Sequence, residues 1–337
     1  GKQETLNRML FDPWSDIEYR TDWNSNAQYW GNFKQFQELK SRYPHLKTLV
    51  SFGGWTLSDH FSDIAAKDSR RKKFAKLCIN FAKKYGFDGI DIDWEYPGFE
   101  KHKGKPEDKQ NFTLLLKELH DLAKAQTPKL LLTIAAPAGH KNIDNMEVEK
   151  IHNYLDFINL MGYDFHGPWE GEQDTVTNHN APLVSPQYGD PKFCVKFAVE
   201  YYLKKGVPAN KLVLGMPLYG RSYAGVDSSK VEVPGLPGLY RPYTEPGEGT
   251  TAEEKGMVLI SDIKNNLLYT YKRYWDPLTK VPYLFNNQEF ISYDDEESLA
   301  IKAEYAKSKG LKGVMVWELE NDPSIWQALT AIRKAFL

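Results

Sequence analysis

Short apolar runs alternate with amphipathic segments along most of the 337-residue chain. Apolar runs of four to eight residues are typical of buried strands, whereas apolar positions spaced three and four apart are typical of helices. After the first 45 residues, the predicted strands cover 46–50, 130–136, 156–164, 212–221 and 313–318. Predicted helices cover 29–40, 108–124, 193–205, 297–308 and 325–336. This alternation indicates an α/β fold, with a parallel sheet and helices outside it.

One further apolar run, at residues 86–96, contains an unusual number of acidic residues. In a strand, Asp91, Asp93 and Glu95 alternate with apolar residues, so the three carboxylates point to one side. Trp94 then points to the opposite side, where we expect it to pack in the core. Buried carboxylates are costly unless they are paired, hydrogen-bonded or protonated. Three in line on one strand face therefore predict shared protons or a bound ligand.

Polar and aromatic residues lie at the carboxyl ends of nearly all the predicted strands. In a TIM-type (β/α)8 barrel this rim carries the active site, whereas a doubly wound sheet concentrates its site at one crevice. The spread of these residues along the chain favours the barrel. They are Trp55, Glu95, Tyr163, Asp164, Tyr219, Arg221 and Trp317.

The segment 222–292 interrupts the alternation, because it is rich in Gly, Pro and Tyr and contains only short strand-like pieces such as 267–271. A stretch of this length is seldom a bare loop in a compact fold. We therefore expect residues 222–292 to fold as a small structured insertion. Residues 1–221 and 293–337 would then form the barrel.

Composition excludes several classes of function. The formal net charge is −2, the charged residues are interspersed, and no apolar run approaches the length of a membrane span. We therefore expect no nucleic-acid partner and no membrane partner. The two cysteines, Cys78 and Cys194, are too few for a disulfide framework or a thiolate zinc site. We expect an extracellular protein, although no signal-peptide pattern opens the sequence.

The acidic stretch carries a family resemblance. Its pattern Asp88-x-x-Asp91-x-Asp93-x-Glu95 resembles the DxxDxDxE signature of the glycoside hydrolase family 18 chitinases. Further stretches resemble other motifs of the family: 51–54 its SxGG motif, 161–164 its MxYD motif, and 215–221 its strand-seven pattern. Trp317 is similar to the last-strand tryptophan of the family, and the segment 222–292 resembles the small α+β insertion found in one of its branches.

Cleavage of a glycosidic bond needs an acid that protonates the leaving oxygen. Glu95 is the best-placed acid, and Asp93 beside it should titrate together with it and help keep a proton on Glu95. The resemblance implies that the N-acetyl carbonyl of the substrate attacks, with net retention and without a cofactor or metal. It also implies that Asp93 receives the acetamido N–H, that Tyr163 bonds the acetamido oxygen, and that Asp91 holds Asp93. Asp88 lies off the alternation and is expected to be structural.

The resemblance implies chitin or N-acetylglucosamine oligosaccharides as the substrate. Aromatic residues near strand ends are candidates for stacking on sugar faces, although core packing would explain any one of them about as well. Asp164 and Arg221 are candidates for bonding sugars, with a structural ion pair as the alternative. The predicted substrate-binding residues are Trp55, Tyr96, Met161, Asp164, Trp169, Tyr219, Arg221 and Trp317. Trp275, in the insertion, is a further aromatic candidate.

Three other functions fit part of the pattern. A chitinase-like lectin would use the same barrel, but members of that kind usually lack the acid that Glu95 supplies here. An endo-β-N-acetylglucosaminidase acting on N-glycans would share the acid pair, and the insertion favours chitin over it. A hard cation could bind Asp91, Asp93 and Glu95, but further oxygen ligands are not evident nearby.

The predicted parallel strands number six, whereas the barrel needs eight. The first βαβ unit of the family would precede the segment that opens this sequence. We therefore expect the chain to be a fragment of a longer protein. Alternatively, the gap is filled by oligomerisation through open strand edges, or by residues 1–30 folding across it.

Overall fold

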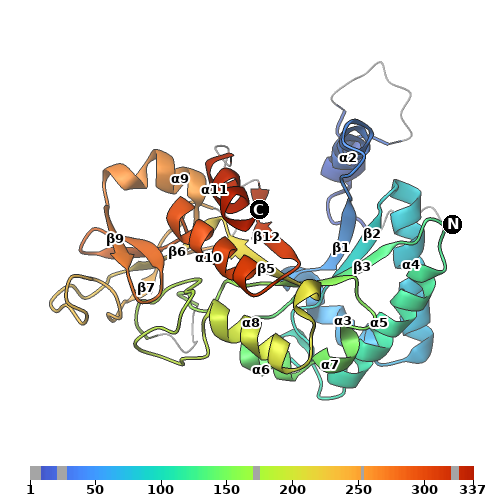
Figure 1. The fold of residues 1–337 in the computed structure, drawn as a ribbon, viewed down its shortest axis with the longest axis horizontal. Helices are drawn as coiled ribbons and strands as arrows, with labels where there is room; N and C mark the ends of the chain where they lie inside the picture. Colours follow the sequence, from blue (N-terminus) through green and yellow to red (C-terminus); the bar gives the residue numbers. More distant parts are fainter. Residues whose placement is uncertain (1–8, 21–28, 170–174, 252–253, 320–325) are drawn as a thin grey trace. The chain divides into compact units, whose positions relative to one another are not determined.

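The computed structural model describes residues 9–20, 29–169, 175–251, 254–319 and 326–337 (Figure 1). Its contacts divide the chain into two compact units. The first unit comprises residues 1–135 and 145–156, and the second comprises residues 136–144 and 157–337. This division differs from the predicted barrel and insertion, and the predicted domain boundaries remain a prediction.

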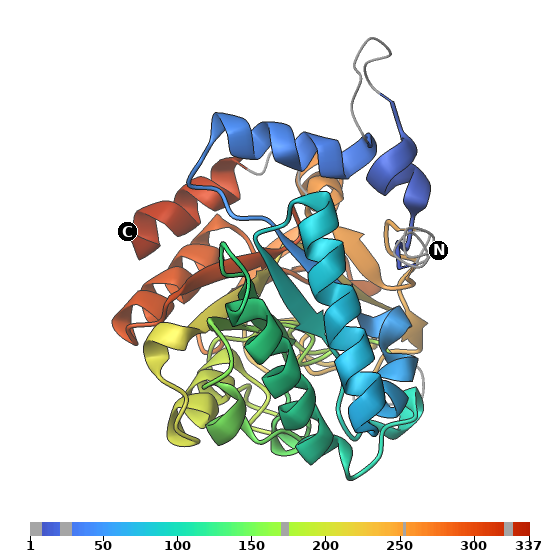
Figure 2. The ribbon, with the colours of Figure 1, turned by 90° about the vertical axis from the view of Figure 1, so that its right-hand side faces the viewer.

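Three parallel strands form the centre of the first unit: β1 (Leu49–Gly53), β2 (Gly89–Asp93) and β3 (Leu131–Ala136). The acidic strand β2 lies in the middle, so its backbone is hydrogen-bonded on both sides. The long helices α4 (Asp68–Tyr85) and α5 (Asp108–Lys124) lie side by side over these strands (Figure 2). The predicted helix over 108–124 is confirmed at both ends.

Helix α4 shows how the local sequence sets these elements. Its apolar positions recur at helical spacing and are buried, and Cys78 lies fully buried among them. The helix ends at Gly86, whose left-handed backbone (φ 72°) directs the chain into β2. The turn between α4 and β2 thus places the acidic strand directly after a buried helix.

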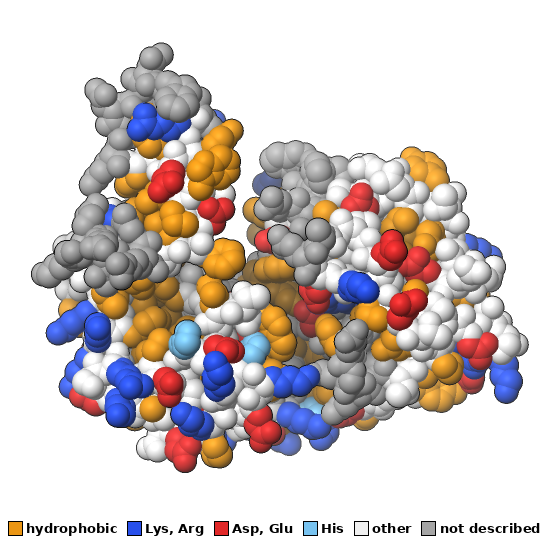
Figure 3. All heavy atoms as spheres, turned by 180° about the vertical axis from the view of Figure 1, so that it is seen from behind, with side chains coloured by type: hydrophobic (Ala, Val, Ile, Leu, Met, Phe, Trp, Pro, Cys, Tyr) orange, Lys and Arg blue, Asp and Glu red, His pale blue; other side chains and the backbone are white. Residues whose placement is uncertain are grey.

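Before β1, the described residues contain the short η1 (Trp14–Glu18) and α2 (Gly31–Arg42), and no strand. The predicted helix over 29–40 is therefore confirmed, shifted by two residues. Orange hydrophobic side chains are visible over this segment in Figure 3. Its exposed apolar residues are Phe11, Trp14, Tyr19, Phe36, Leu39 and Tyr43.

The second unit contains three further parallel strands, with β5 (Leu212–Pro217) between β4 (Phe157–Leu160) and β12 (Gly313–Trp317). Every residue of β5 is buried, as expected for a parallel strand covered on both faces. Three helices accompany these strands: α8 (Val195–Lys204), α10 (Glu296–Ser308) and α11 (Trp326–Phe336). They confirm the helices predicted near 193–205, 297–308 and 325–336, of which residue 325 lies outside the described residues.

An antiparallel sheet in the second unit has the strand order β7-β6-β11-β10-β9, with β8 also paired to β6. Its strands are β6 (Tyr219–Ala224), β7 (Glu245–Pro246), β8 (Met257–Leu259), β9 (Lys272–Asp276), β10 (Val281–Phe285) and β11 (Glu289–Ser292). Helix α9 (Ile260–Asn265) follows β8. A sheet and a helix thus lie within the segment predicted to be an α+β insertion.

Two strand predictions are wrong here. Residues 212–221 do not form one strand, because β5 ends at Pro217 and β6 begins at Tyr219 in the antiparallel sheet. Proline lacks the N–H that a central strand would need to continue its ladder. The predicted strand over 267–271 begins instead as the 3-10 turn η5 (Leu267–Tyr269), and β9 starts only at Lys272. Apolar residues in so short a run do not distinguish a turn from a strand.

The remaining elements are short. They are η2 (Trp55–His60), α3 (Phe61–Ala65), η3 (Glu100–His102), α6 (His140–Asp144), α7 (Val148–Ile151) and η4 (Ala209–Lys211). Cys194 is buried at the start of α8, where its sulfur accepts the N–H of Phe197. None of the helices in the described residues is long and apolar enough to cross a membrane.

Candidate active site

The carboxylates of the acidic stretch follow the predicted alternation. Asp91 and Asp93 lie on β2, and Glu95 follows just beyond its end. Trp94 is 2% exposed and stacks on Phe61, with ring centroids 5.4 Å apart. The prediction that Trp94 is a core residue is confirmed, and the apolar side of the strand is covered.

Asp91 is held by hydroxyl groups from both neighbouring strands. Ser51 on β1 and Thr133 on β3 are its direct register partners. The Ser51 hydroxyl donates to Asp91 Oδ2 at 2.8 Å, and the Thr133 hydroxyl donates to Oδ1 at 2.6 Å. Neutral donors at both oxygens stabilise a carboxylate without a cation. Asp91 can thus place negative charge next to Asp93.

Asp93 has the most perturbed environment of the three carboxyls. Burial, followed by the charges of Glu95 and Asp91, raises the pKa of Asp93 from its ordinary 3.8 to about 8. Its buried Oδ1 atom has no hydrogen-bond partner among the described residues. At neutral pH the Asp93–Glu95 pair therefore retains a proton, and one oxygen of Asp93 is available to a ligand.

The backbone of Glu95 is clamped by two residues that the sequence analysis did not identify. Its N–H donates to the hydroxyl of the buried Ser58 at 2.8 Å, and that hydroxyl donates to the Gly54 carbonyl at 2.9 Å. Its carbonyl oxygen lies 2.6 Å from Nδ1 of His102. Ser58 is 37 positions from Glu95, so no local pattern indicated the contact. These residues orient the predicted acid through its main chain.

Aromatic rings surround this clamp. The Trp55 ring lies 4.4 Å from His102 and 5.8 Å from Phe99, and Tyr96 lies 6.1 Å from Phe99. Trp55 is 51% exposed, which leaves much of its surface open to a ligand. The predicted Trp55 and Tyr96 therefore belong to the same cluster as the carboxylates.

The structure explains why the motif at residues 51–54 has a glycine at position 53. A Cβ atom at this position would collide with the carbonyl oxygen of Asp93, and the backbone φ of 122° also favours glycine. The N–H of the next residue, Gly54, donates to the same carbonyl at 2.8 Å. The missing side chain of Gly53 thus lets β1 pass close along the acidic strand.

The contacts of Asp88 indicate a structural role for this residue. Its side chain accepts the N–H of Thr48 at 2.9 Å and pairs with Lys40 at 2.9 Å. Burial works against the charge, but these contacts outweigh it and lower the pKa of Asp88. It ties the start of β2 to the residue before β1, away from the carboxyl end of the strand.

In the second unit, three predicted aromatic residues form a chain of edge-to-face rings. Tyr163 lies 6.0 Å from Tyr219, which lies 5.3 Å from Trp317. Tyr163 and Tyr219 are buried, with Met161 packed against them, whereas Trp317 is 41% exposed. Trp317 is therefore the ring of this group most open to a ligand.

Arg221 contacts other predicted residues of the second unit, among them Asp164 and Trp169. Its guanidinium donates to Asp164 Oδ1 at 2.7 and 2.9 Å and to Glu254 Oε1 at 2.6 Å. Its central carbon lies 5.5 Å from the Trp169 ring centroid and 5.1 Å from that of Tyr219. Asp164 stands in the left-handed region (φ 55°), and its N–H donates to the Asn180 side chain. The ion pair offered as an alternative is present, and the sequence analysis missed Glu254 and Asn180.

The structure thus groups the predicted residues into two sets, each within one unit. The first contains Asp91, Asp93, Glu95, Trp55 and Tyr96. The second contains Met161, Tyr163, Asp164, Trp169, Tyr219, Arg221 and Trp317. Among the described residues, no group of three His, Cys, Asp or Glu side chains is arranged to hold a metal ion, so a cation at the acidic strand gains no support.

Comparison with known proteins identifies a family and several relatives of this chain. Residues 7–322 match the family model of glycosyl hydrolases family 18. The chain is 41% identical to Chitinase A1 of Niallia circulans over 95% of its length and 48% of that protein. It is 39% identical to Chitotriosidase-1 of Mus musculus, over 86% of this chain and 61% of the relative.

A solved structure, Chitinase ChiA74 from Bacillus thuringiensis, is similar with a TM-score of 0.85 and 38% identity. The similarity covers 95% of this chain and 57% of that one. The chain spans about half to three fifths of the length of these relatives. The predicted α/β class with a TIM-type barrel is confirmed by these relatives, and the described residues supply six parallel strands of it. By its sequence and its structure, the chain belongs to glycosyl hydrolases family 18.

Proposed function

We propose that this protein is a chitinase that hydrolyses β-1,4-linked N-acetylglucosamine polymers by a substrate-assisted, retaining mechanism. The observation that carries the proposal is the row of carboxyls on β2, in which Asp93 has a raised pKa and a buried, unpartnered oxygen. The curated relatives named above are chitinases or a chitotriosidase. Similar solved structures include an Ostrinia furnacalis chitinase in complex with allosamidin and another in complex with penta-N-acetylchitooctaose.

In the proposed reaction, Glu95 donates a proton to the leaving glycosidic oxygen. The acetamido carbonyl oxygen of the substrate attacks the anomeric carbon, and an oxazolinium ion forms in place of a covalent enzyme intermediate. Water then opens this ion while Glu95 takes a proton back, so the anomeric configuration is retained. Asp93 accepts the acetamido N–H as a carboxylate, because the proton of the coupled Asp93–Glu95 pair lies on Glu95 when Glu95 acts as the acid.

The other predicted residues position the substrate. Tyr163 donates its hydroxyl hydrogen to the acetamido oxygen, and Trp317 and Trp55 stack on sugar faces. Asp164 and Arg221 bond sugar hydroxyls with the donor and acceptor capacity that remains outside their ion pair. Tyr96, Met161, Trp169 and Tyr219 complete the walls of the sugar site.

The decisive variant is Glu95→Gln, which keeps the shape of the side chain and removes the transferable proton. We expect turnover of N-acetylglucosamine oligomers to fall by about 10²- to 10⁴-fold, with oligomer binding retained. Glu100→Gln is the matched control, because Glu100 is an exposed glutamate five positions further on. Wild-type turnover in Glu95→Gln would exclude Glu95 as the acid.

Analysis of the products separates the alternatives. Hydrolysis of defined N-acetylglucosamine oligomers with initial retention, followed by NMR, supports the proposal, and an inverted product would exclude attack by the acetamido group. Cleavage of an N-glycan substrate instead would identify an endo-β-N-acetylglucosaminidase.

A binding protein remains the second candidate. A similar solved structure, human YKL-39, is described as a pseudo-chitinase with retained chitooligosaccharide binding properties, at 30% identity. Binding of oligomers without cleavage by the wild-type chain would identify that function. The presence of Glu95, clamped by Ser58 and His102, favours the enzyme.

Two further predictions belong to this proposal. Among the described residues, β1 pairs only with β2 and β12 pairs only with β5, and an open strand edge can accept a strand of another chain. We propose that the chain self-associates through these edges. Light scattering across a concentration series would detect the association.

We also propose that the protein acts outside the cell, where a polymer substrate is accessible. Fractionation of an expressing culture tests this location.

A further inference from the structure

The antiparallel sheet of the second unit borders a pocket of about 340 Å³ that the catalytic scheme does not use. Three segments far apart in the sequence line it: Gln187, the loop 233–240, and the end of β9 with its following turn, 275–278. Its volume lies at the lower end of the range typical of small-molecule sites. Trp275, singled out by the sequence as an aromatic candidate, is half-buried in its wall.

The walls of this pocket are held by hydrogen bonds. The Asp276 carboxylate accepts the N–H of Leu278 at 2.9 Å and the hydroxyl of Thr279 at 2.7 Å, which fixes the turn after β9. Beside the lining residue Leu236, the Tyr283 hydroxyl donates to the Pro237 carbonyl at 2.9 Å. A pocket whose walls are already fixed costs a ligand little ordering entropy.

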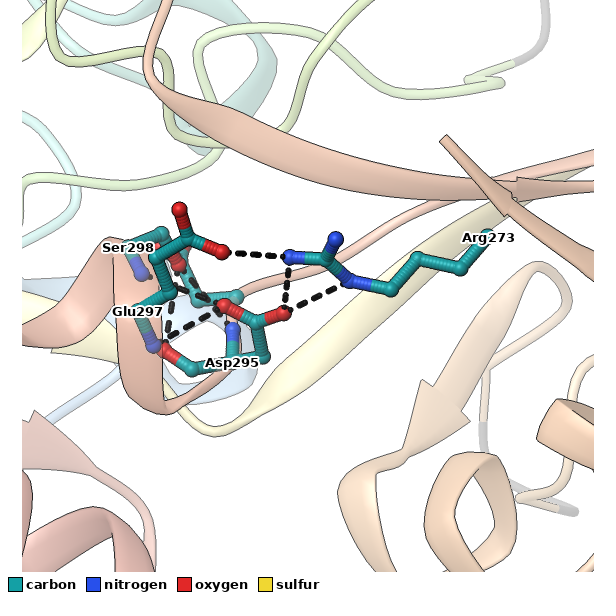
Figure 4. A network of polar contacts seen from close by, with 5 residues as sticks. Arg273, Asp295, Glu297 and Ser298 are labelled. Atoms are coloured by element: carbon teal, nitrogen blue, oxygen red, sulfur yellow. Dashed lines mark hydrogen bonds and ion pairs between the residues drawn. The ribbon is translucent and has the colours of Figure 1, made fainter. Parts of the chain in front are cut away.

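Trp275 has its own support. On a strand, Arg273 and Trp275 point to the same side, and the guanidinium carbon lies 5.5 Å from the Trp275 ring centroid. Figure 4 shows that Arg273 is bonded to the start of α10. Its guanidinium donates to Asp295 at 2.7 and 3.0 Å and to Glu297 at 2.9 Å. The cation that lies against Trp275 is therefore fixed in place.

The lining of the pocket consists mostly of apolar residues, including two aromatic rings, and has few polar groups. Trp275, Tyr240 and two prolines supply apolar faces, while the exposed Gln187 supplies an amide donor and acceptor. The Tyr240 hydroxyl accepts the Gln187 N–H at 3.1 Å and keeps its own hydrogen as a donor. The single charged residue of the lining, Asp276, is 2% exposed and already bonded. This combination suits a neutral ring with apolar faces and a polar rim.

We propose that this pocket is a second carbohydrate site, which takes an N-acetylglucosamine unit of the same polymer that the protein cleaves. The inference rests on the proposed function. A second point of attachment raises the local concentration of an insoluble chain at the enzyme, whereas a soluble oligomer gains nothing from it. The site thus serves insoluble chitin specifically.

The test compares Trp275→Ala with Trp275→Tyr and with Tyr269→Ala, an 82% exposed aromatic outside the pocket. Each is made in the wild-type chain and in the Glu95→Gln background. Adsorption of the Glu95→Gln forms to insoluble chitin is measured beside hydrolysis of insoluble chitin and of a soluble trimer by the active forms. Circular dichroism confirms that each variant is folded.

We expect Trp275→Ala to lower adsorption and insoluble-chitin hydrolysis about fivefold or more, a far larger loss than on the trimer. Trp275→Tyr should keep most of the adsorption, and Tyr269→Ala should match the parent. Unchanged adsorption of Trp275→Ala, or equal losses on both substrates, would overturn the second site while wild-type trimer hydrolysis upholds the proposed function. A wild-type chain that neither cleaves the trimer nor adsorbs would overturn both.

Discussion

Two aspartates of this protein, the half-buried Asp93 and the buried Asp276, have opposite acidities. Asp93, at the end of β2 in the first unit, has a pKa raised to about 8, whereas the pKa of Asp276, at the end of β9 in the second unit, is lowered to about 2. Burial by itself raises both values. The difference therefore lies in the neighbours, not in the degree of burial.

The neighbours of Asp276 are donors. His179 Nε2 lies 3.1 Å from its carboxylate, and Thr279 and the N–H of Leu278 donate to it. The neighbours of Asp93 are the carboxylates of Asp91 and Glu95, which add to the effect of burial. Donors stabilise a charged carboxylate and make it a structural anchor, whereas like charges keep a proton on it and make it available for chemistry.

The largest expected effect is on catalysis. Asp93→Asn removes the titrating partner of Glu95 and replaces the charged acceptor proposed for the acetamido N–H with a neutral amide oxygen, so turnover should fall by about 10²- to 10⁴-fold. Because Asp93 titrates with a pKa of about 8, the wild-type rate should change near that pH, and the residual activity of the variant should lose this limb. Rates on a soluble oligomer from pH 4 to 10 provide the measurement. An unchanged pH profile would refute the coupling of Asp93 and Glu95.

A second effect is on the free energy of unfolding. Its expected sign differs between asparagine substitutions of Asp93 and of Asp276. The folded pKa of Asp93 is above its unfolded value, so its contribution to stability is present below pH 4 and is lost as the pH rises towards 8. Asp93→Asn should therefore be more stable than wild type at pH 8, by up to roughly 5 kcal/mol at about 1.4 kcal/mol per pKa unit. The two proteins should converge near pH 4. Urea unfolding at both pH values measures the gap, and an equal gap at both would contradict the raised pKa.

Asp276→Asn should have a smaller effect of opposite sign. The amide has one acceptor oxygen where the carboxylate has two, so it can accept from Leu278 or from Thr279 but not from both, and it loses the charge that faces His179. We therefore expect a loss of about 1–3 kcal/mol at pH 7. Because the folded pKa of Asp276 is below its unfolded value, this loss should shrink as the pH falls from 4 towards 2. Glu304→Gln, on the exposed side of α10, is the control and should be neutral. If the loss of unfolding free energy in Asp276→Asn grew as the pH fell, the lowered pKa of Asp276 would be contradicted.

Much of the fold could be read from the chain because its signals are local. The period of α5 and the glycine that ends α4 are properties of neighbouring residues, and the structure has α5 where the sequence predicted it. The failures arose where tertiary partners decide. Pro217 ends β5, and the following residues join a different sheet, which no alternation of apolar residues signals. Likewise, η5 occupies a run whose composition fits a strand equally well.

By itself, the sequence determined the composition of the acidic row, because strand alternation places Asp91, Asp93 and Glu95 on one face wherever that strand is packed. Only the tertiary structure decided what each carboxyl does. Ser51 and Thr133 meet Asp91 across two strand registers, and Ser58 reaches Glu95 from 37 positions away. Proton affinity depends on burial and on the charges and donors within a few ångströms, and folding brings these together from distant parts of the chain.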